Sequence, residues 1–179
     1  MRLFASLTLW IFTIGTGFIL GAAVYETLVV VPFWAGNAPQ SLMNSNPFLL
    51  VPIRSGQVFW PVVTPGLGIV ALAAFLTSFG MPRKEMIWRL AGTGLFLVMT
   101  IVTLVYFRPS IIDMVVHHGA GRSGDALAAE AKMWVALNWL RIAAVAASLG
   151  MGLRALTLPR LHEHGNECEA MPAMEKTNA

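Results

Sequence analysis

Four long apolar stretches dominate the sequence and restrict the folds that are open to it. They cover residues 5–31, 55–79, 86–107 and 132–156. Each has roughly 20 residues or more, the length that an α-helix needs to cross the approximately 30 Å hydrocarbon layer of a bilayer. We therefore predict an all-α fold, an integral membrane four-helix bundle. It forms a single transmembrane domain over residues 1–158.

The charge content supports a membrane protein. Of the 179 residues, 56% are hydrophobic and 12% are charged, about half the share of charge in a usual soluble domain. The net charge of +3 comes largely from Lys and Arg at the ends of the apolar stretches, as is typical of membrane orientation signals. The expected partner is therefore the lipid bilayer and not a nucleic acid. The single cysteine, Cys168, excludes an intramolecular disulfide and a cysteine-based metal site within one chain.

The first apolar stretch has a competing interpretation as a secretory signal peptide. Arg2 would be its basic start and residues 21–23, Gly-Ala-Ala, its cleavage site. The apolar run nevertheless continues from Leu28 through Val31, beyond the length of a signal peptide. We therefore favour a membrane span.

Prolines predict where the helices end or bend. The segment 32–54 contains Pro39, Pro47 and Pro52 and is expected to be a connection. Pro61 and Pro65 are expected to kink the second helix or to limit its regular part. The third helix is expected to end near Pro109, followed by a loop at 110–131.

The last helix and the tail differ in character. Ser123 or Asp125 is a suitable N-cap residue, so the fourth helix is expected to begin outside the membrane and to enter it near Trp134. Residues 159–179 are polar and without periodicity. We predict a disordered cytoplasmic tail there.

Lysine and arginine residues predict the orientation. Six lie on the side of the N-terminus and four on the opposite side, which favours cytoplasmic termini. We expect a multi-pass protein of a bacterial inner membrane. The six are Arg2, Arg83, Lys84, Arg89, Arg154 and Arg160, and the four are Arg54, Arg108, Arg122 and Lys132.

Two ionisable residues lie inside the apolar stretches. An arginine such as Arg141 costs about 2.5–3.5 kcal/mol at the centre of a membrane helix on insertion scales, so we expect it to have a partner. Glu26 is the candidate because the two residues lie at similar depths. Glu26 is about 12 Å from the middle of the first helix toward the outer side, and Arg141 is about 6 Å from the middle of the fourth helix toward the same side. Asn138 is one turn further out. The three residues therefore share the outer half of the bilayer.

Helical periodicity places these polar groups on inward faces. Residues 15, 19, 22 and 26 share one face of the first helix, and two of them are small. The fourth helix carries a stripe of polar and small residues, which suits helix packing in membranes. The stripe consists of Trp134, Asn138, Arg141, Val145, Ser148 and Gly152.

This constellation permits two interpretations. In the first, Glu26 and Arg141 are catalytic, as acid or base and as a fixed cation, in a site that oxygenates or binds a small apolar aromatic or lipid-like molecule. Its ligand-binding residues would be Tyr25, Arg54, Arg108, Trp134 and Asn138. In the second, the chain is a non-catalytic membrane subunit or structural bundle, and Glu26 with Arg141 is an ion pair that pins two helices together.

Metal binding is a weaker alternative. Adjacent side chains on a helix point about 100° apart, so His117 and His118 seldom share a metal unless a loop allows it. With Glu26 they would supply two histidines and one carboxylate, an arrangement that binds non-haem iron. We assign no metal ligand, and the sequence identifies neither a cofactor nor an oligomeric state.

Three motifs along the chain point to a family. They are a small-residue run before Tyr25 and Pro32, the pair Asn46-Pro47, and a last helix that opens W-x3-N-x2-R with Trp134, Asn138 and Arg141. In these motifs the chain resembles the anthrone-oxygenase-like family of small membrane proteins, which is largely catalogued as a domain of unknown function. The resemblance covers about residues 5–156 and implies a four-helix membrane protein. Members of the family are linked to the oxygenation of anthrones to anthraquinones, without an established cofactor.

Overall fold

The computed structural model describes residues 2–43, 47–115, 117 and 121–158. These residues form helices and no strand. The elements are α1 (Arg2–Tyr25), the π-helical turn η1 (Glu26–Val30), α2 (Val31–Ala35), α3 (Gln40–Met43), α4 (Pro47–Leu76), the 3₁₀ turn η2 (Thr77–Gly80), α5 (Arg83–Val102), the π-helical turn η3 (Thr103–Phe107), α6 (Arg108–Val115) and α7 (Gly124–Thr157).

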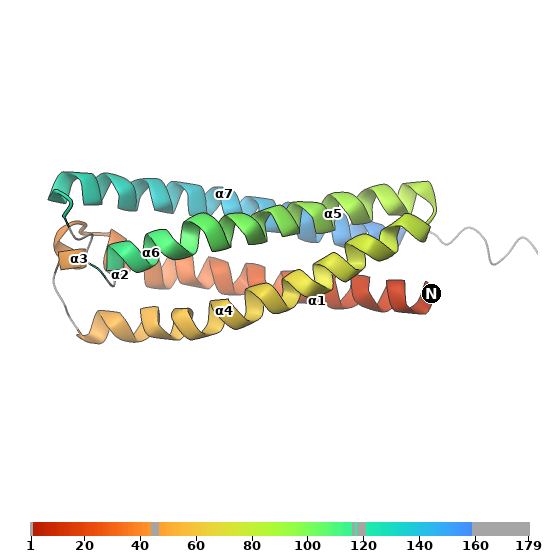
Figure 1. Cartoon of the computed structure of the whole chain (residues 1–179), viewed down its shortest axis with the longest axis horizontal. Helices are drawn as coiled ribbons and strands as arrows, with labels where there is room; N and C mark the ends of the chain where they lie inside the picture. The colour runs from red at the N-terminus through yellow and green to blue at the C-terminus, as the bar shows by residue number, and fades with distance from the viewer. Residues whose placement is uncertain (1, 44–46, 116, 118–120, 159–179) are drawn as a thin grey trace, which may run out of the picture.

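Four helical segments within the described ranges are long and apolar enough to cross a membrane. They are the first span (Leu3–Ala35), the second span (Val58–Gly80), the third span (Arg83–Val115) and the fourth span (Gly124–Thr157). They run side by side along the long axis of the molecule (Figure 1). α1 and α5 each pack against both α4 and α7. The chain is thus an all-α bundle, as predicted.

The two ends of the bundle differ. One end holds the N-terminus, the turn between α4 and α5, and the end of α7, and we call it the N-terminal end (Figure 1). The other holds α2, α3, α6 and the start of α7, and we call it the α3 end. The first and third spans both finish at the α3 end.

Prolines do not end the first and third spans. Both spans were expected to stop near Pro32 and Pro109, but the helix continues to Ala35 in one and to Val115 in the other. A π-helical turn precedes each proline at the same offset, η1 before Pro32 and η3 before Pro109. Proline lacks an N–H and its ring crowds the carbonyl four residues earlier, and membrane helices accommodate it by local π adjustments. The helix therefore widens by one residue and passes the proline.

The second helix is also longer than predicted. α4 begins at Pro47, within the segment expected to be a connection, and is α-helical through Pro61 and Pro65 to Leu76. Proline is tolerated in the first turn of a helix, where its N–H is not needed. The predicted connection at 32–54 is shortened accordingly.

α7 begins outside the apolar stretch, as expected. Ser123 is its N-cap, and its Oγ accepts a hydrogen bond of 3.3 Å from the backbone N–H of Ala126. Because α6 extends the third span to Val115, the predicted loop at 110–131 is shorter than expected. The predicted disordered tail, residues 159–179, lies outside the described residues.

Small residues allow α5 and α7 to approach closely. Ser148 on α7 donates a 2.8 Å hydrogen bond from Oγ to the carbonyl of Gly92 on α5. A Cβ atom at Gly92 would lie 3.1 Å from the carbonyl oxygen of Ser148 and 3.0 Å from Cβ of Met151. Close backbone approach through small residues is a common way for membrane helices to associate.

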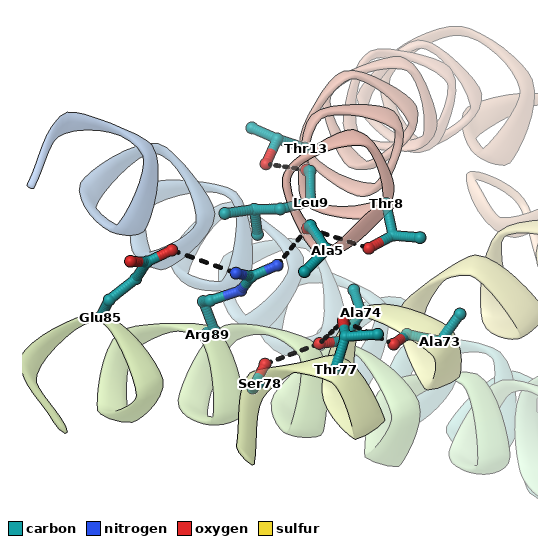
Figure 2. Close-up of polar contacts among 10 residues, drawn as sticks. All are labelled: Ala5, Thr8, Leu9, Thr13, Ala73, Ala74, Thr77, Ser78, Glu85 and Arg89. Atoms are coloured by element: carbon teal, nitrogen blue, oxygen red, sulfur yellow. Dashed lines mark hydrogen bonds and ion pairs between the residues drawn. The ribbon is translucent and has the colours of Figure 1, made fainter. Parts of the chain in front are cut away.

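A buried arginine links α5 to α1 at the N-terminal end (Figure 2). The side chain of Arg89 is 1% exposed and forms a 3.1 Å ion pair from Nη1 to Glu85, one turn earlier on α5. Its Nη2 donates to the backbone carbonyl of Ala5 on α1. The same carbonyl accepts a 3.0 Å hydrogen bond from Thr8 Oγ1. The guanidinium thus joins two helices through a backbone acceptor.

Candidate functional site

A cavity of about 400 Å³ lies between the four spans toward the α3 end. This volume falls within the range of roughly 300–1,000 Å³ that is usual for small-molecule sites. All four spans contribute, and most of the lining side chains are apolar or aromatic. The lining residues are Glu26, Val30, Trp34, Gly56, Trp60, Pro61, Thr64, Thr103, Leu104, Phe107, Arg108, Ile111, Ile112, Trp134 and Arg141.

Three charged side chains reach this cavity: Glu26, Arg108 and Arg141. Glu26 and Arg141 attract each other electrostatically, and Glu26 has a side-chain hydrogen bond with Trp60. The direct ion pairs among the described residues involve other side chains, so Glu26 and Arg141 are not in salt-bridge contact. The cavity therefore holds a carboxyl group and a guanidinium that face the same space without forming a direct ion pair.

Arg141 is held by aromatic rings. Its guanidinium carbon lies 4.8 Å from the ring centroid of Phe107 and 5.9 Å from that of Trp60. Cation–π contacts of this kind are attractive within about 6 Å and become stronger when the cation is removed from water. The rings offset part of the cost of placing the guanidinium in the bundle.

A second aromatic group forms the wall nearer the α3 end. The rings of Trp34 and Trp134 meet edge to face with centroids 5.2 Å apart, and those of Phe107 and Trp134 lie 5.5 Å apart. The indole N–H of Trp134 donates a 3.3 Å hydrogen bond to the backbone carbonyl of Phe107. These contacts fix the ring planes, so the wall presents rigid aromatic surfaces to the cavity.

Both π-helical turns border the cavity. η1 supplies Glu26 and Val30, and η3 supplies Thr103, Leu104 and Phe107. A π turn inserts one residue and changes the direction in which the following side chains point, and such turns are frequent at functional sites. The two turns thus shape the same space from the first and third spans.

Asn138 joins the first and fourth spans beside the cavity. It is fully buried, and its Nδ2 donates a 2.7 Å hydrogen bond to Oγ1 of Thr27 on η1. Thr27 Oγ1 in turn donates over 2.7 Å to the carbonyl of Ala23. Asn138 was predicted to bind a ligand, but it does not line the cavity. A neutral hydrogen bond therefore connects the two helices that the charged pair was thought to pin.

The other predicted residues divide between the cavity and its surroundings. Arg108 and Trp134 line the cavity with Glu26 and Arg141. Tyr25 does not line it; its side chain is 62% exposed and contributes to the outer surface of the bundle. The side chain of Arg54 lies outside the described residues. The predicted set thus supplies four of the lining residues.

The histidine pair gives no support for a metal site. His117 is exposed, and His118 lies outside the described residues. Within the part of the chain that the structure describes, no group of three or more His, Cys, Asp or Glu side chains is placed to hold a metal ion.

Sequence reasoning missed three important aromatic residues. Trp34 lies in the segment predicted to be a connection, Trp60 directly precedes Pro61, where a kink was expected, and Phe107 is the last residue of the third apolar stretch. All three line the cavity. Each of these aromatic residues lies within about two helical turns of an intramembrane charge or of a proline that a helix can pass, and this proximity could have identified them from the sequence.

The fold and the cavity together define a class: a multi-pass helical membrane protein with a charged, aromatic-walled cavity among its four spans. Comparison with protein families found no match, and neither a curated protein nor a solved structure matches the chain.

Proposed function

We propose that the cavity binds a small, planar aromatic molecule that carries an acidic hydroxyl group and reaches the site from the bilayer. The observation that carries this proposal is the pair Glu26 and Arg141, which share the cavity without a direct ion pair. A phenolic oxygen fits between a carboxylate that accepts its proton and a guanidinium that stabilises its charge. The aromatic wall formed by Trp34, Phe107 and Trp134 suits a flat ring.

The same residues support a chemical role in addition to binding. Glu26 takes a phenolic or benzylic proton, and Arg141 holds the resulting oxyanion. Oxygenation of a benzylic methylene by dioxygen then follows the balance CH2 + O2 → C=O + H2O, with dioxygen as the oxidant. This is the reaction class implied by the resemblance to the anthrone-oxygenase-like family. Binding without turnover is the alternative role of the same cavity.

The proposed orientation places the cavity in the outer half of the bilayer and both termini in the cytoplasm. The N-terminal end of the bundle carries Arg83, Lys84, Arg89 and Arg154. Arg2, in the first turn of α1, adds a fifth basic residue to this end, whereas Arg54, Arg108, Arg122 and Lys132 lie in or next to segments toward the α3 end. Because positive charge is retained on the cytoplasmic side, this asymmetry supports the proposal. The membrane proposed is a bacterial inner membrane.

The most direct experiment is mass spectrometry of small molecules that copurify with the detergent-solubilised protein. We expect an aromatic hydroxyl compound with the native protein and its loss with Arg141→Met. Arg154→Met is the matched control, because Arg154 is exposed on the same helix and does not line the cavity. Its preparation should retain the compound.

A double variant separates this proposal from a purely structural pair. If Glu26 and Arg141 only pinned two helices, replacing both, by Glu26→Gln and Arg141→Met, would restore stability and leave copurification intact. Retention of the aromatic compound by a folded double variant contradicts the proposed function. Loss of the compound with normal thermal unfolding supports it.

A further inference from the structure

A second, much smaller chamber adjoins the main cavity on the side of the bundle centre. Its volume is about 30 Å³. Four side chains border both spaces, so the two spaces adjoin each other around Arg141. These shared residues are Trp60, Thr64, Thr103 and Arg141.

The remaining wall of the small chamber is apolar. It is formed by Ile19 and Ala23 from α1, Phe96 and Met99 from α5, and Ile142 and Val145 from α7, together with Thr100.

The threonines of α5 and η3 do not alter this character. Thr100 Oγ1 donates 2.9 Å to the carbonyl of Phe96, and Thr103 Oγ1 donates 2.8 Å to that of Met99. Each hydroxyl is thus satisfied within its own helix. Little in this part of the wall remains to hold a water molecule, which needs two to four polar partners.

The size of the chamber limits what can enter it. A space for one water-sized atom measures about 10–15 Å³ on this scale, so 30 Å³ accepts about two heavy atoms. An aromatic ring is too large. A methyl or ethyl group on a molecule held at Glu26 and Arg141 would fit and would contact the apolar side chains of the wall.

We propose that the small chamber is a specificity subsite for a short alkyl substituent of the molecule bound in the main cavity. This proposal rests on the proposed function of the main cavity. The aromatic hydroxyl group is placed by Glu26 and Arg141, and the alkyl group extends past Arg141 into the bundle centre. The subsite thereby selects alkyl-substituted aromatic hydroxyl compounds over unsubstituted ones.

The test compares phenol and 2-ethylphenol as probes, because an ethyl group next to the hydroxyl lies on the side of Arg141 where the chamber begins. Their affinities are measured by calorimetry on the full chain in lipid nanodiscs, with empty nanodiscs subtracted. A pocket that accommodates one added methylene typically gains about tenfold or more in affinity, so we expect at least that preference for 2-ethylphenol. Ala23→Val fills part of the chamber and should lower the preference several-fold while phenol affinity is kept.

Ala146→Val is the matched control, because it makes the same change at an exposed position of α7. It should leave the preference unchanged. Val145→Leu fills the chamber from the opposite helix and replaces Ala23→Val if that variant does not fold. If phenol binds but neither Ala23→Val nor Val145→Leu changes the preference for the alkyl-substituted probe, the subsite proposal is wrong and the proposed function of the main cavity stands. Absence of binding by both probes would overturn the proposed function and the subsite with it.

Discussion

Asn138 on α7 donates a 2.7 Å hydrogen bond to Thr27 on the π turn of the first span. Both side chains are buried, Asn138 completely and Thr27 to 5% exposure. This neutral contact links the first and fourth spans at the level of the cavity. Glu26 precedes Thr27 by one residue, and Arg141 follows Asn138 by three. Because the neutral bond holds the two helices together, both charged side chains are left to face the cavity.

Replacing Thr27 with valine should destabilise the protein. Thr27→Val keeps the shape of the side chain but removes the acceptor of the Asn138 hydrogen bond and leaves a buried amide unpaired. Hydrogen bonds between membrane helices contribute about 0.6 kcal/mol on average and up to about 1.7 kcal/mol. We expect a loss of about 1 kcal/mol in the free energy of unfolding in mixed micelles.

Thr16→Val is the control for this variant. Thr16 is also fully buried on the first span, but its Oγ1 donates only within its own helix, 2.7 Å to the carbonyl of Phe12. Its replacement should cost less than that of Thr27. Equal losses would show that the bond between the helices contributes nothing beyond the intrahelical one.

Arg89→Met should also lower stability, by about 1–3 kcal/mol, because the variant removes two hydrogen bonds from a buried charged group. One goes to Glu85 and the other to the Ala5 carbonyl of α1. Arg83→Met, at an exposed position on the same helix, should change the free energy of unfolding by less than about 0.5 kcal/mol. Similar effects of the two substitutions would argue against a structural role of the Arg89 contact.

Gly92→Ala tests the close approach of α5 and α7. The added methyl group would press on Met151 and on the Ser148 carbonyl, and overpacking of this kind costs about 1–3 kcal/mol. Gly66→Ala on α4 is the control, because a Cβ there meets nothing within 4 Å. Removing a glycine from a helix interior stabilises by about 0.5–1 kcal/mol, so the two variants should shift the unfolding temperature in opposite directions.

Cysteine labelling tests the orientation. In a background with Cys168→Ser, a cysteine at Ser123, which is exposed before α7, should react with an impermeant maleimide added to intact cells. A cysteine at Met81, between α4 and α5, should react only after the cells are opened. The reverse pattern would place the N-terminal end and both termini outside.

The sequence was sufficient to predict the architecture, because the length and hydropathy of a membrane span are local properties. It also predicted the inward stripe of α7, where Trp134, Asn138, Val145, Ser148 and Gly152 are buried. The positions at which the helices end were harder to predict from the sequence. A proline normally ends a helix, and the sequence does not indicate that a π turn will let the helix pass Pro32 and Pro109.

The composition of the site was only partly predictable. Glu26 and Arg141 were found because a charge is rare in an apolar stretch. The partner of Asn138 was not, because Thr27 resembles the other threonines that bond to their own helix, such as Thr16. Which threonine also accepts a bond from another helix depends on the rotation of that helix, and η1 changes this rotation.

The π turns η1 and η3 have a consequence for how a cavity of this kind arises and disappears. Each is equivalent to the insertion of one residue into a regular helix. Deleting one residue there, for example the exposed Val29, would restore the α-helix and rotate everything beyond it by about 100°. Trp34 would then turn away from Trp134. The gain or loss of a single codon in either span is therefore enough to open or close the binding wall, although the span changes by only one residue and remains long and apolar enough to cross a membrane.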